Sequence, residues 1–151
     1  ILMEKVFISH NEAETAEIAA KLAKMTKQGD IWALSGTLGM GKSVFARAFI
    51  QTLSDAEEVP SPTFTLVQTY RTPLFDIYHY DLYRLKEASE IFELGVEEAF
   101  YEGVSLVEWP EKMGAFAPRN MWQVQIEAAG EHRKITIRTD DAHKTERLAN
   151  V

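Results

Sequence analysis

The chain has 151 residues, which is enough for one domain with a substantial core and short for two. Sixteen basic against 23 acidic residues give a formal charge of −7, which argues against a broad nucleic-acid-binding face. Cysteine is absent, which excludes disulfides and thiol catalysis, and no apolar run approaches the roughly 20 residues of a membrane span; we therefore expect one cytoplasmic domain over residues 1–151 without membrane contact.

The chain begins with the patterns of a strand, a helix and a second strand. Residues 6–8 predict a short strand. Apolar residues then recur at helical spacing, with Asn11 or Ser9 as the candidate N-cap and Gly29 as the glycine that ends the helix. Residues 30–35 are mostly apolar and predict a strand that leads directly into a glycine-rich segment.

That segment, residues 36–43, reads Gly-Thr-Leu-Gly-Met-Gly-Lys-Ser and fits the phosphate-binding pattern G-x-x-x-x-G-K-[ST] without a mismatch. Glycines let successive backbone N–H groups point at phosphate oxygens, the lysine supplies a charge for the β- and γ-phosphates, and the serine offers a hydroxyl to magnesium. A helix predicted over 44–53 places its positive end on the same phosphates. The residues expected at the nucleotide are Gly36, Leu38, Gly39, Met40, Gly41, Lys42, Ser43 and Val44.

The middle of the chain predicts a hairpin, a helical region and a buried strand. Residues 63–70 and 74–80 have strand patterns joined by a short turn, which indicates an antiparallel hairpin. Residues 87–101 predict one or two short helices interrupted at Gly95, and residues 104–107 predict a buried strand.

The last part of the chain adds a second hairpin. We expect a loop or broken helix over 110–118, alternating strands over 123–127 and 133–138, and a polar tail, helical or frayed, from residue 140. These elements together predict an α/β fold: a single P-loop NTPase-like domain with a mixed, mainly parallel central sheet, antiparallel hairpins and flanking helices.

Two acids follow strands directly. Magnesium-assisted phosphoryl transfer needs a carboxylate beside the phosphate loop, and open α/β sheets place their ligands at the carboxyl ends of strands. Glu108 closes the strand 104–107, and Asp81 follows the strand that ends at Tyr80. Each also has a structural interpretation, since Glu108 suits a solvated loop and Asp81 suits a turn cap. The local pattern does not decide which of the two holds the metal.

Four other residues have both a functional and a structural interpretation. The hydroxyls of Ser61 and Thr63 are placed either to reach the γ-phosphate or to form a turn before a strand. Trp109 is suited either to stacking in a partner contact or to covering the edge of the core. His79, on a strand among aromatic residues, is expected to be structural rather than a metal ligand.

Four motifs, in this order, resemble the bacterial TsaE (YjeE) family over nearly the whole chain. They are Gly-x-Leu-Gly-x-Gly-Lys-Ser at 36–43, Ser-Pro-Thr-Phe-Thr-Leu at 61–66, His-Tyr-Asp-Leu-Tyr-Arg-Leu at 79–85 and Val-Glu-Trp-Pro-Glu at 107–111. The resemblance implies a small P-loop ATPase in the threonylcarbamoyladenosine modification of tRNAs that read codons beginning with adenosine. It further implies that the protein supports multiple turnovers of a TsaD–TsaB complex, does not perform the transfer itself, and contacts tRNA indirectly.

The resemblance also assigns roles to single residues. Lys42 and the loop glycines would hold the phosphates of ATP, Ser43 and Glu108 would hold Mg²⁺, and Asp81 would take part in hydrolysis. Lys42, Asp81 and Glu108 are therefore the expected catalytic residues.

The resemblance implies two further regions of the nucleotide site. The segment from Ser61 to Thr65 resembles a nucleotide-sensing switch, with Thr63 at the nucleotide. Asn11, Glu12 and Thr15 are expected on the adenine side.

The sequence leaves two other functions open. A small-metabolite P-loop kinase shares the loop and the size, but it needs an acceptor pocket and usually an arginine-bearing lid, and arginines are sparse between Glu111 and Arg138. A non-hydrolysing nucleotide-sensing subunit would bind ATP tightly without turnover. No arginine is marked by a motif as a charge-stabilising finger, so we expect slow hydrolysis by the isolated chain.

Overall fold

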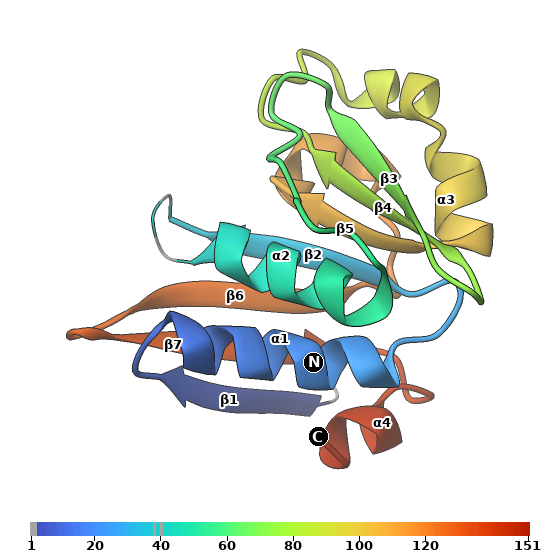
Figure 1. Ribbon diagram of the computed structural model, residues 1–151. Helices are drawn as coiled ribbons and strands as arrows, with labels where there is room; N and C mark the ends of the chain where they lie inside the picture. Colours follow the sequence, from blue (N-terminus) through green and yellow to red (C-terminus); the bar gives the residue numbers. More distant parts are fainter. Residues whose placement is uncertain (1–2, 38, 40) are drawn as a thin grey trace.

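The computed structural model describes residues 3–37, 39 and 41–151, and its strands form one seven-stranded sheet (Figure 1). In order across the sheet they are β1 (Met3–Ser9), β7 (His132–Thr139), β6 (Trp122–Ala129), β2 (Ile31–Gly36), β5 (Val104–Glu108), β4 (Asp76–Asp81) and β3 (Val67–Arg71). The pairs from β6 to β4 are parallel, and the pairs β1–β7, β6–β7 and β3–β4 are antiparallel. The predicted mixed α/β sheet with antiparallel hairpins is confirmed. Its parallel part consists of the four strands from β6 to β4, and because three of the six strand pairs are antiparallel, the sheet is less parallel than expected.

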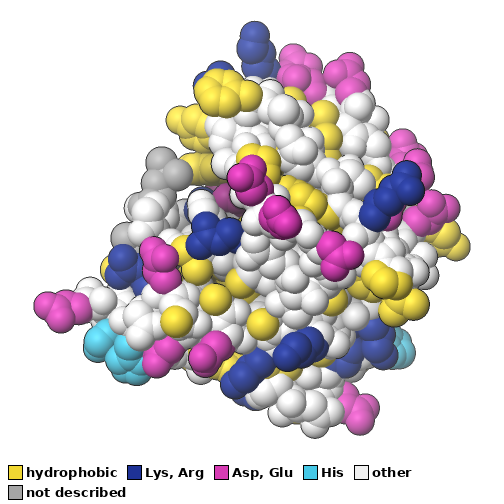
Figure 2. Space-filling view, in the orientation of Figure 1, with side chains coloured by type: hydrophobic (Ala, Val, Ile, Leu, Met, Phe, Trp, Pro, Cys, Tyr) yellow, Lys and Arg dark blue, Asp and Glu magenta, His cyan; other side chains and the backbone are white. Residues whose placement is uncertain are grey.

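Helices cover both faces of the sheet. On one face, α1 (Glu12–Met25) and α2 (Lys42–Leu53) pack side by side (Figure 1). On the other, α3 (Val96–Glu102) and the 3₁₀ helices η1 (Ala88–Leu94) and η2 (Pro110–Phe116) cover β2, β5 and β4, and the short α4 (Thr145–Ala149) follows β7. Acidic and basic side chains are interspersed over the face that carries α1 and α2 (Figure 2). None of the helices in the described part of the chain combines the length and apolarity needed to cross a membrane.

Alternating side chains along β2 divide the core into two layers. Trp32 and Leu34 pack with α1 and α2, whereas Ile31 and Ala33 pack with η1, α3 and η2. All four are buried, as a central parallel strand between two helical layers requires. The ring of Trp32 stacks on the ring of Trp122 in β6, with 4.9 Å between centroids, and so fixes these neighbouring strands against each other.

The first helix begins as predicted but ends earlier. Asn11 caps α1, since its Oδ1 accepts a hydrogen bond from a first-turn N–H group at 2.9 Å. The helix ends at Met25, so the expectation that Gly29 would terminate it is wrong. The reason is a local one: the carboxylate of Asp30 accepts hydrogen bonds from the hydroxyl of Thr26 and the N–H of Lys27, so the chain leaves the helix three residues before Gly29.

The strand predicted over 63–70 is shorter in the structure. The N–H of Leu66 donates to the carbonyl of Pro62 at 2.7 Å, and Leu66 has a left-handed φ of 69°. Residues 63–66 therefore form a turn, and β3 begins at Val67. The partner strand is shifted as well, from the predicted 74–80 to the observed Asp76–Asp81. As a result, Thr63 takes no part in the sheet.

An ion pair joins the C-terminal helix to the beginning of β2. Nη1 and Nη2 of Arg147 lie 2.7 and 2.9 Å from the two carboxylate oxygens of Asp30, which is buried. The same guanidinium lies 5.2 Å from the ring centroid of Trp122. These contacts attach α4 at the end of the sheet opposite the glycine-rich loop (Figure 1).

Arg147→Met is expected to lower the free energy of unfolding by about 2–3 kcal/mol, because the buried carboxylate of Asp30 loses its charged partner. The matched control is Arg138→Met, which removes a surface pair with Glu4 at 3.4 Å and should change stability by less than about 0.5 kcal/mol. Urea denaturation followed by circular dichroism measures both variants. Equal losses would show that the Asp30–Arg147 pair contributes no more than a surface contact.

Candidate functional site

Two glycines define the loop between β2 and α2. A Cβ on Gly36 would lie 2.3 Å from the carbonyl oxygen of Ile126, so only glycine lets β2 end this close to β6. Gly41 has a left-handed φ of 104°, and its carbonyl accepts a hydrogen bond from the N–H of Phe45 at 3.0 Å. The helix therefore begins at Lys42, with the free N–H groups of its first turn at the loop.

The first two residues of α2 differ in their surroundings. Lys42 is buried, and its Nζ lies 4.7 Å from the ring centroid of Trp109, which is a cation–π contact. Ser43 is exposed. Trp109 follows β5 directly and has a left-handed φ of 57°. The indole is therefore a partner of the Lys42 ammonium group.

The two predicted acids meet at the ends of neighbouring parallel strands. Glu108 ends β5, Asp81 ends β4, and the two are paired directly in register. Leu34 of β2 pairs with Glu108 from the other side. Since Leu34 packs with α1 and α2, the two acids in the same cross-strand row point to that face as well. The structure thus brings both carboxylates to the face on which α2 begins, and both are buried.

Asp81 is hydrogen-bonded to the turn before β3. Its Oδ2 accepts a bond from the hydroxyl of Thr63 at 3.0 Å, and its Oδ1 accepts one from the N–H of Tyr83, also at 3.0 Å. The hydroxyls of Thr63 and Ser61 lie 2.7 Å apart. Asp81 therefore caps a turn, as its structural interpretation predicts, and lines the cleft as well.

Glu108 is hydrogen-bonded to His79. Oε2 of the carboxylate lies 2.8 Å from Nε2 of the imidazole, and both side chains are buried. His79 is structural in the sense that it lies in the core, yet it hydrogen-bonds a predicted site residue.

Most of the predicted residues line one cleft of about 290 Å³. Those that line it are Glu12, Gly39, Gly41, Lys42, Ser43, Val44, Thr63, Asp81 and Glu108. Ser61 and Trp109 line it too. Gly36 is not among the lining residues, and its role in the structure is the close approach of β2 to β6. The predictions for Leu38 and Met40 lie outside the described residues.

A second cleft of about 250 Å³ continues the first and shares Glu12, Gly39, Gly41 and Val44 with it. Asn11 and Thr15, which are predicted for the adenine side, also line this cleft. Both have structural bonds besides: Asn11 caps α1, and the hydroxyl of Thr15 lies 2.7 Å from that of Ser9. The structure therefore brings Asn11, Glu12 and Thr15 next to the loop.

The sequence did not point to His10, Glu131 and Arg133, which line the second cleft. Arg133 reaches it because β7 pairs with β1 and places Arg133 opposite Ser9. A pairing between the first and last strands leaves no local pattern, so no motif marks these residues in advance.

The donor set suits magnesium bound together with a nucleotide. Within the described residues, no group of three or more histidine, aspartate or glutamate side chains is placed to hold a metal. Magnesium usually takes one or two carboxylates together with phosphate oxygens and waters. The Ser43 hydroxyl and the Glu108 carboxylate fit that arrangement. Of the described residues that line the main cleft, only Lys42 is cationic. Two buried carboxylates, those of Asp81 and Glu108, therefore face one positive side chain, and a bound cation would offset the remaining negative charge.

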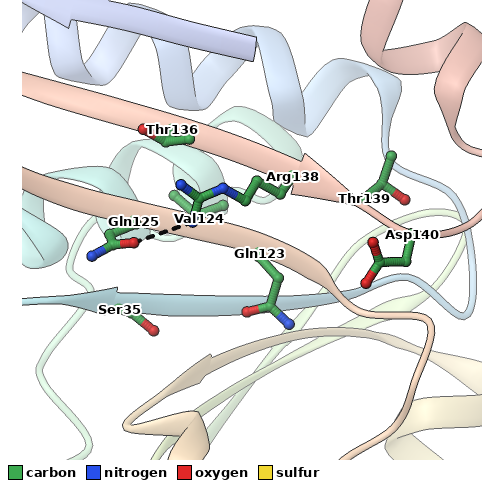
Figure 3. A pocket seen from close by; sticks show the side chains of 8 residues that line it. All are labelled: Ser35, Gln123, Val124, Gln125, Thr136, Arg138, Thr139 and Asp140. Carbon is green, nitrogen blue, oxygen red and sulfur yellow. Dashed lines mark hydrogen bonds between the residues drawn. The ribbon is translucent and has the colours of Figure 1, made fainter. Parts of the chain in front are cut away.

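A separate hollow of about 360 Å³ lies on the face of β6 and β7 that points away from α1 and α2 (Figure 3). Its side chains include Gln123, Gln125 and Arg138 (Figure 3). The guanidinium of Arg138 is engaged by Gln125 and by Glu4, each at 3.4 Å. The hollow shares no residue with the two clefts and has no helix N-terminus among its lining, so it lacks the features that predict phosphate binding.

Both a solved crystal structure and curated protein sequences are similar to this chain. The crystal structure of YdiB from Bacillus subtilis matches with a TM-score of 0.82 and 30% identity, and the match covers 99% of this chain and 94% of that one. The tRNA threonylcarbamoyladenosine biosynthesis protein TsaE of Rickettsia felis is 42% identical over 131 residues, or 86% of this chain and 77% of the relative. The protein of the same name from Bacillus subtilis is 39% identical over 129 residues, or 84% of this chain and 80% of the relative.

A family model agrees with these relatives. The model described as "Threonylcarbamoyl adenosine biosynthesis protein TsaE" matches residues 9–136. That range contains every residue that lines the two adjoining clefts. The chain belongs to the TsaE family.

Proposed function

We propose that this chain is a magnesium-dependent ATPase and an accessory subunit of the TsaD–TsaB complex in the threonylcarbamoyladenosine modification of tRNA. One observation carries the ATPase part. Lys42 and Ser43, at the start of α2, share a cleft with Asp81 and Glu108, at the ends of β4 and β5. An ammonium group, a hydroxyl and two carboxylates at a helix N-terminus are the groups that phosphoryl transfer to water uses.

The loop and the start of α2 bind the triphosphate. The N–H groups of the first turn and the positive end of the helix dipole attract phosphate oxygens. When ATP binds, the ammonium of Lys42 leaves the ring of Trp109 and pairs with the β- and γ-phosphates, because a charged oxygen attracts it more strongly than an aromatic face does. Ser43 and Glu108 would hold Mg²⁺, which when bound neutralises charge on the same phosphates.

Asp81 positions the water that attacks the γ-phosphate. Hydrogen bonds from Thr63 and Tyr83 hold its carboxylate at the cleft, where its remaining lone pairs orient a water toward the γ-phosphate. Lys42 and the loop N–H groups stabilise the charge that develops on the phosphate oxygens. Because residues 63–66 form a turn outside the sheet, this segment is placed to respond to the γ-phosphate and to its loss.

The cellular role rests on the family. The curated relatives from Rickettsia felis and Bacillus subtilis are named as tRNA threonylcarbamoyladenosine biosynthesis proteins. The charge of −7 and the interspersed acidic and basic side chains in Figure 2 favour contact with tRNA through other proteins rather than directly. We assign the transfer step and the tRNA contact to TsaD and TsaB, and the ATP cycle to this chain.

Substitutions in the cleft test the assigned roles. Lys42→Ala should lose nucleotide binding or turnover, and Glu108→Ala should lower kcat by about a hundredfold or more and disturb its dependence on Mg²⁺, because each removes charge stabilisation at the phosphates. Arg138→Met, outside the cleft, is the control and should hydrolyse ATP at the wild-type rate. Phosphate release is measured across a Mg²⁺ titration. Wild-type turnover in both cleft variants would contradict the proposed site.

Hydrolysis by the isolated chain should be slow and should rise at least about a hundredfold when TsaD and TsaB are added. The reason is that no arginine lines the main cleft in the described part of the chain, and a charge-stabilising arginine is worth on the order of 10³–10⁵ in rate. Phosphate release and tRNA modification are measured together. Phosphate passed to a metabolite hydroxyl would indicate a kinase, and tight ATP binding without turnover under every condition would indicate a nucleotide sensor.

Trp109 should report nucleotide binding. Withdrawal of the Lys42 ammonium from the indole changes the surroundings of that ring, whereas Trp32 and Trp122 are fully buried in the core. Tryptophan emission should therefore change when ATP and Mg²⁺ are added, and Trp109→Phe should abolish the change. A response of unaltered size in Trp109→Phe would mean that the signal arises elsewhere.

A further inference from the structure

His79 is a polar side chain in an otherwise apolar layer. Because alternate residues of a strand share a face, Ile77, His79 and Asp81 of β4 all point toward α2. His79 is 2% exposed, and its neighbours Ile77 and Leu106 belong to the apolar core. An apolar side chain would satisfy the packing here, so the imidazole indicates a requirement other than packing.

In the part of the chain that the structure describes, this imidazole hydrogen-bonds one group, and that group belongs to a site residue. Nε2 of His79 lies 2.8 Å from Oε2 of Glu108, and within the described structure no other group hydrogen-bonds this carboxylate. An ionised carboxylate only accepts, so Nε2 carries the proton and donates it to the bond. Nδ1 is buried without a partner in the described structure, as suits the nitrogen that carries no proton.

We infer that His79 is a positioning residue that, through its Nε2–H, holds the Glu108 carboxylate in the orientation in which magnesium is bound with ATP. The inference rests on the proposed function, because it deepens the role of Glu108. A glutamate side chain has three torsions to fix, and a bond made within the fold supplies that order before the nucleotide arrives. Outer partners of metal-binding side chains typically change metal affinity by about 10- to 100-fold.

The same geometry argues against His79 as a ligand itself. Its Nε2 is occupied by Glu108, and its Nδ1 has no exposed surface. His79 is also not among the residues that line the cleft. Any effect of His79 on magnesium therefore passes through the carboxylate of Glu108.

The variants His79→Gln and His79→Asn form a matched pair that tests this role. The glutamine amide extends to about the position of Nε2 and supplies an N–H donor, whereas asparagine is equally polar but one methylene shorter and does not reach Glu108. Binding of a fluorescent ATP analogue is measured with Mg²⁺ and with EDTA. We expect His79→Asn to bind about tenfold more weakly than wild type with Mg²⁺ and equally well in EDTA, and His79→Gln to recover most of the loss.

A second readout and a control separate positioning from packing. The Mg²⁺ concentration at half-maximal hydrolysis should rise about tenfold in His79→Asn, with the KM for ATP at saturating Mg²⁺ unchanged. In a Glu108→Ala background, His79→Asn should cause no further loss of Mg²⁺-dependent binding. Thr136→Val is the control for losing a buried polar atom elsewhere, since Thr136 is buried, its hydroxyl has no partner in the described structure, and it lies outside the cleft.

The outcomes distinguish the inference from the proposed function. Equal Mg²⁺-dependent binding by wild type and His79→Asn overturns the inference and leaves the ATPase proposal standing. Losses of the same size with Mg²⁺ and with EDTA also overturn it, because they would reflect packing alone. A wild-type protein that binds the analogue equally with Mg²⁺ and with EDTA overturns the proposed magnesium site, and the inference with it.

Discussion

The arrangement of the site depends on one row of residues across three parallel strands. Leu34 of β2, Glu108 of β5 and Asp81 of β4 lie side by side in register. A shift of one residue in either pairing would turn a carboxylate toward η1, α3 and η2, because side chains alternate between the faces of a sheet. Two residues earlier, in the next row on the same face, Trp32 is paired with Leu106, and both are buried against α1 and α2. Packing of these large apolar side chains thus sets the register that places the carboxylates.

The two ends of β2 differ in how charge is balanced. At the beginning, the carboxylate of Asp30 is matched by the guanidinium of Arg147 and by further hydrogen bonds. At the other end, Asp81 and Glu108 share a cleft with Lys42 as the one cationic side chain among the described lining residues. Buried charge without a full complement of partners is costly unless a ligand supplies them. At this end of the strand, the Mg²⁺ ion of the proposed function would supply the positive charge that the two carboxylates lack.

Local patterns in the sequence predict those parts of the site that are contiguous. The glycine loop, the helix after it and the acids at strand ends each lie within a stretch of a few residues, and the structure brings them together. The end of α1 and the turn before β3 were not predicted, because single hydrogen bonds to the Asp30 carboxylate and the Pro62 carbonyl set them, and a bond over three or four residues leaves no periodic pattern. The position of Arg133 and the bond from His79 to Glu108 depend on pairings distant in sequence, for which a single chain carries no periodic signal.

Trp109 combines a favourable contact with an unfavourable backbone. Its φ of 57° is left-handed, which costs a non-glycine residue on the order of 1–3 kcal/mol. Glycine would relieve that strain, yet it would also remove the ring on which the ammonium of Lys42 rests. The ring also packs against the core layer of η1, α3 and η2 and lies 4.9 Å from the ring of Tyr83, contacts that glycine would lose as well. The strained backbone at this position is therefore retained for the sake of what the side chain touches, and an attempt to relax the turn by shortening the side chain would exchange strain for lost contacts.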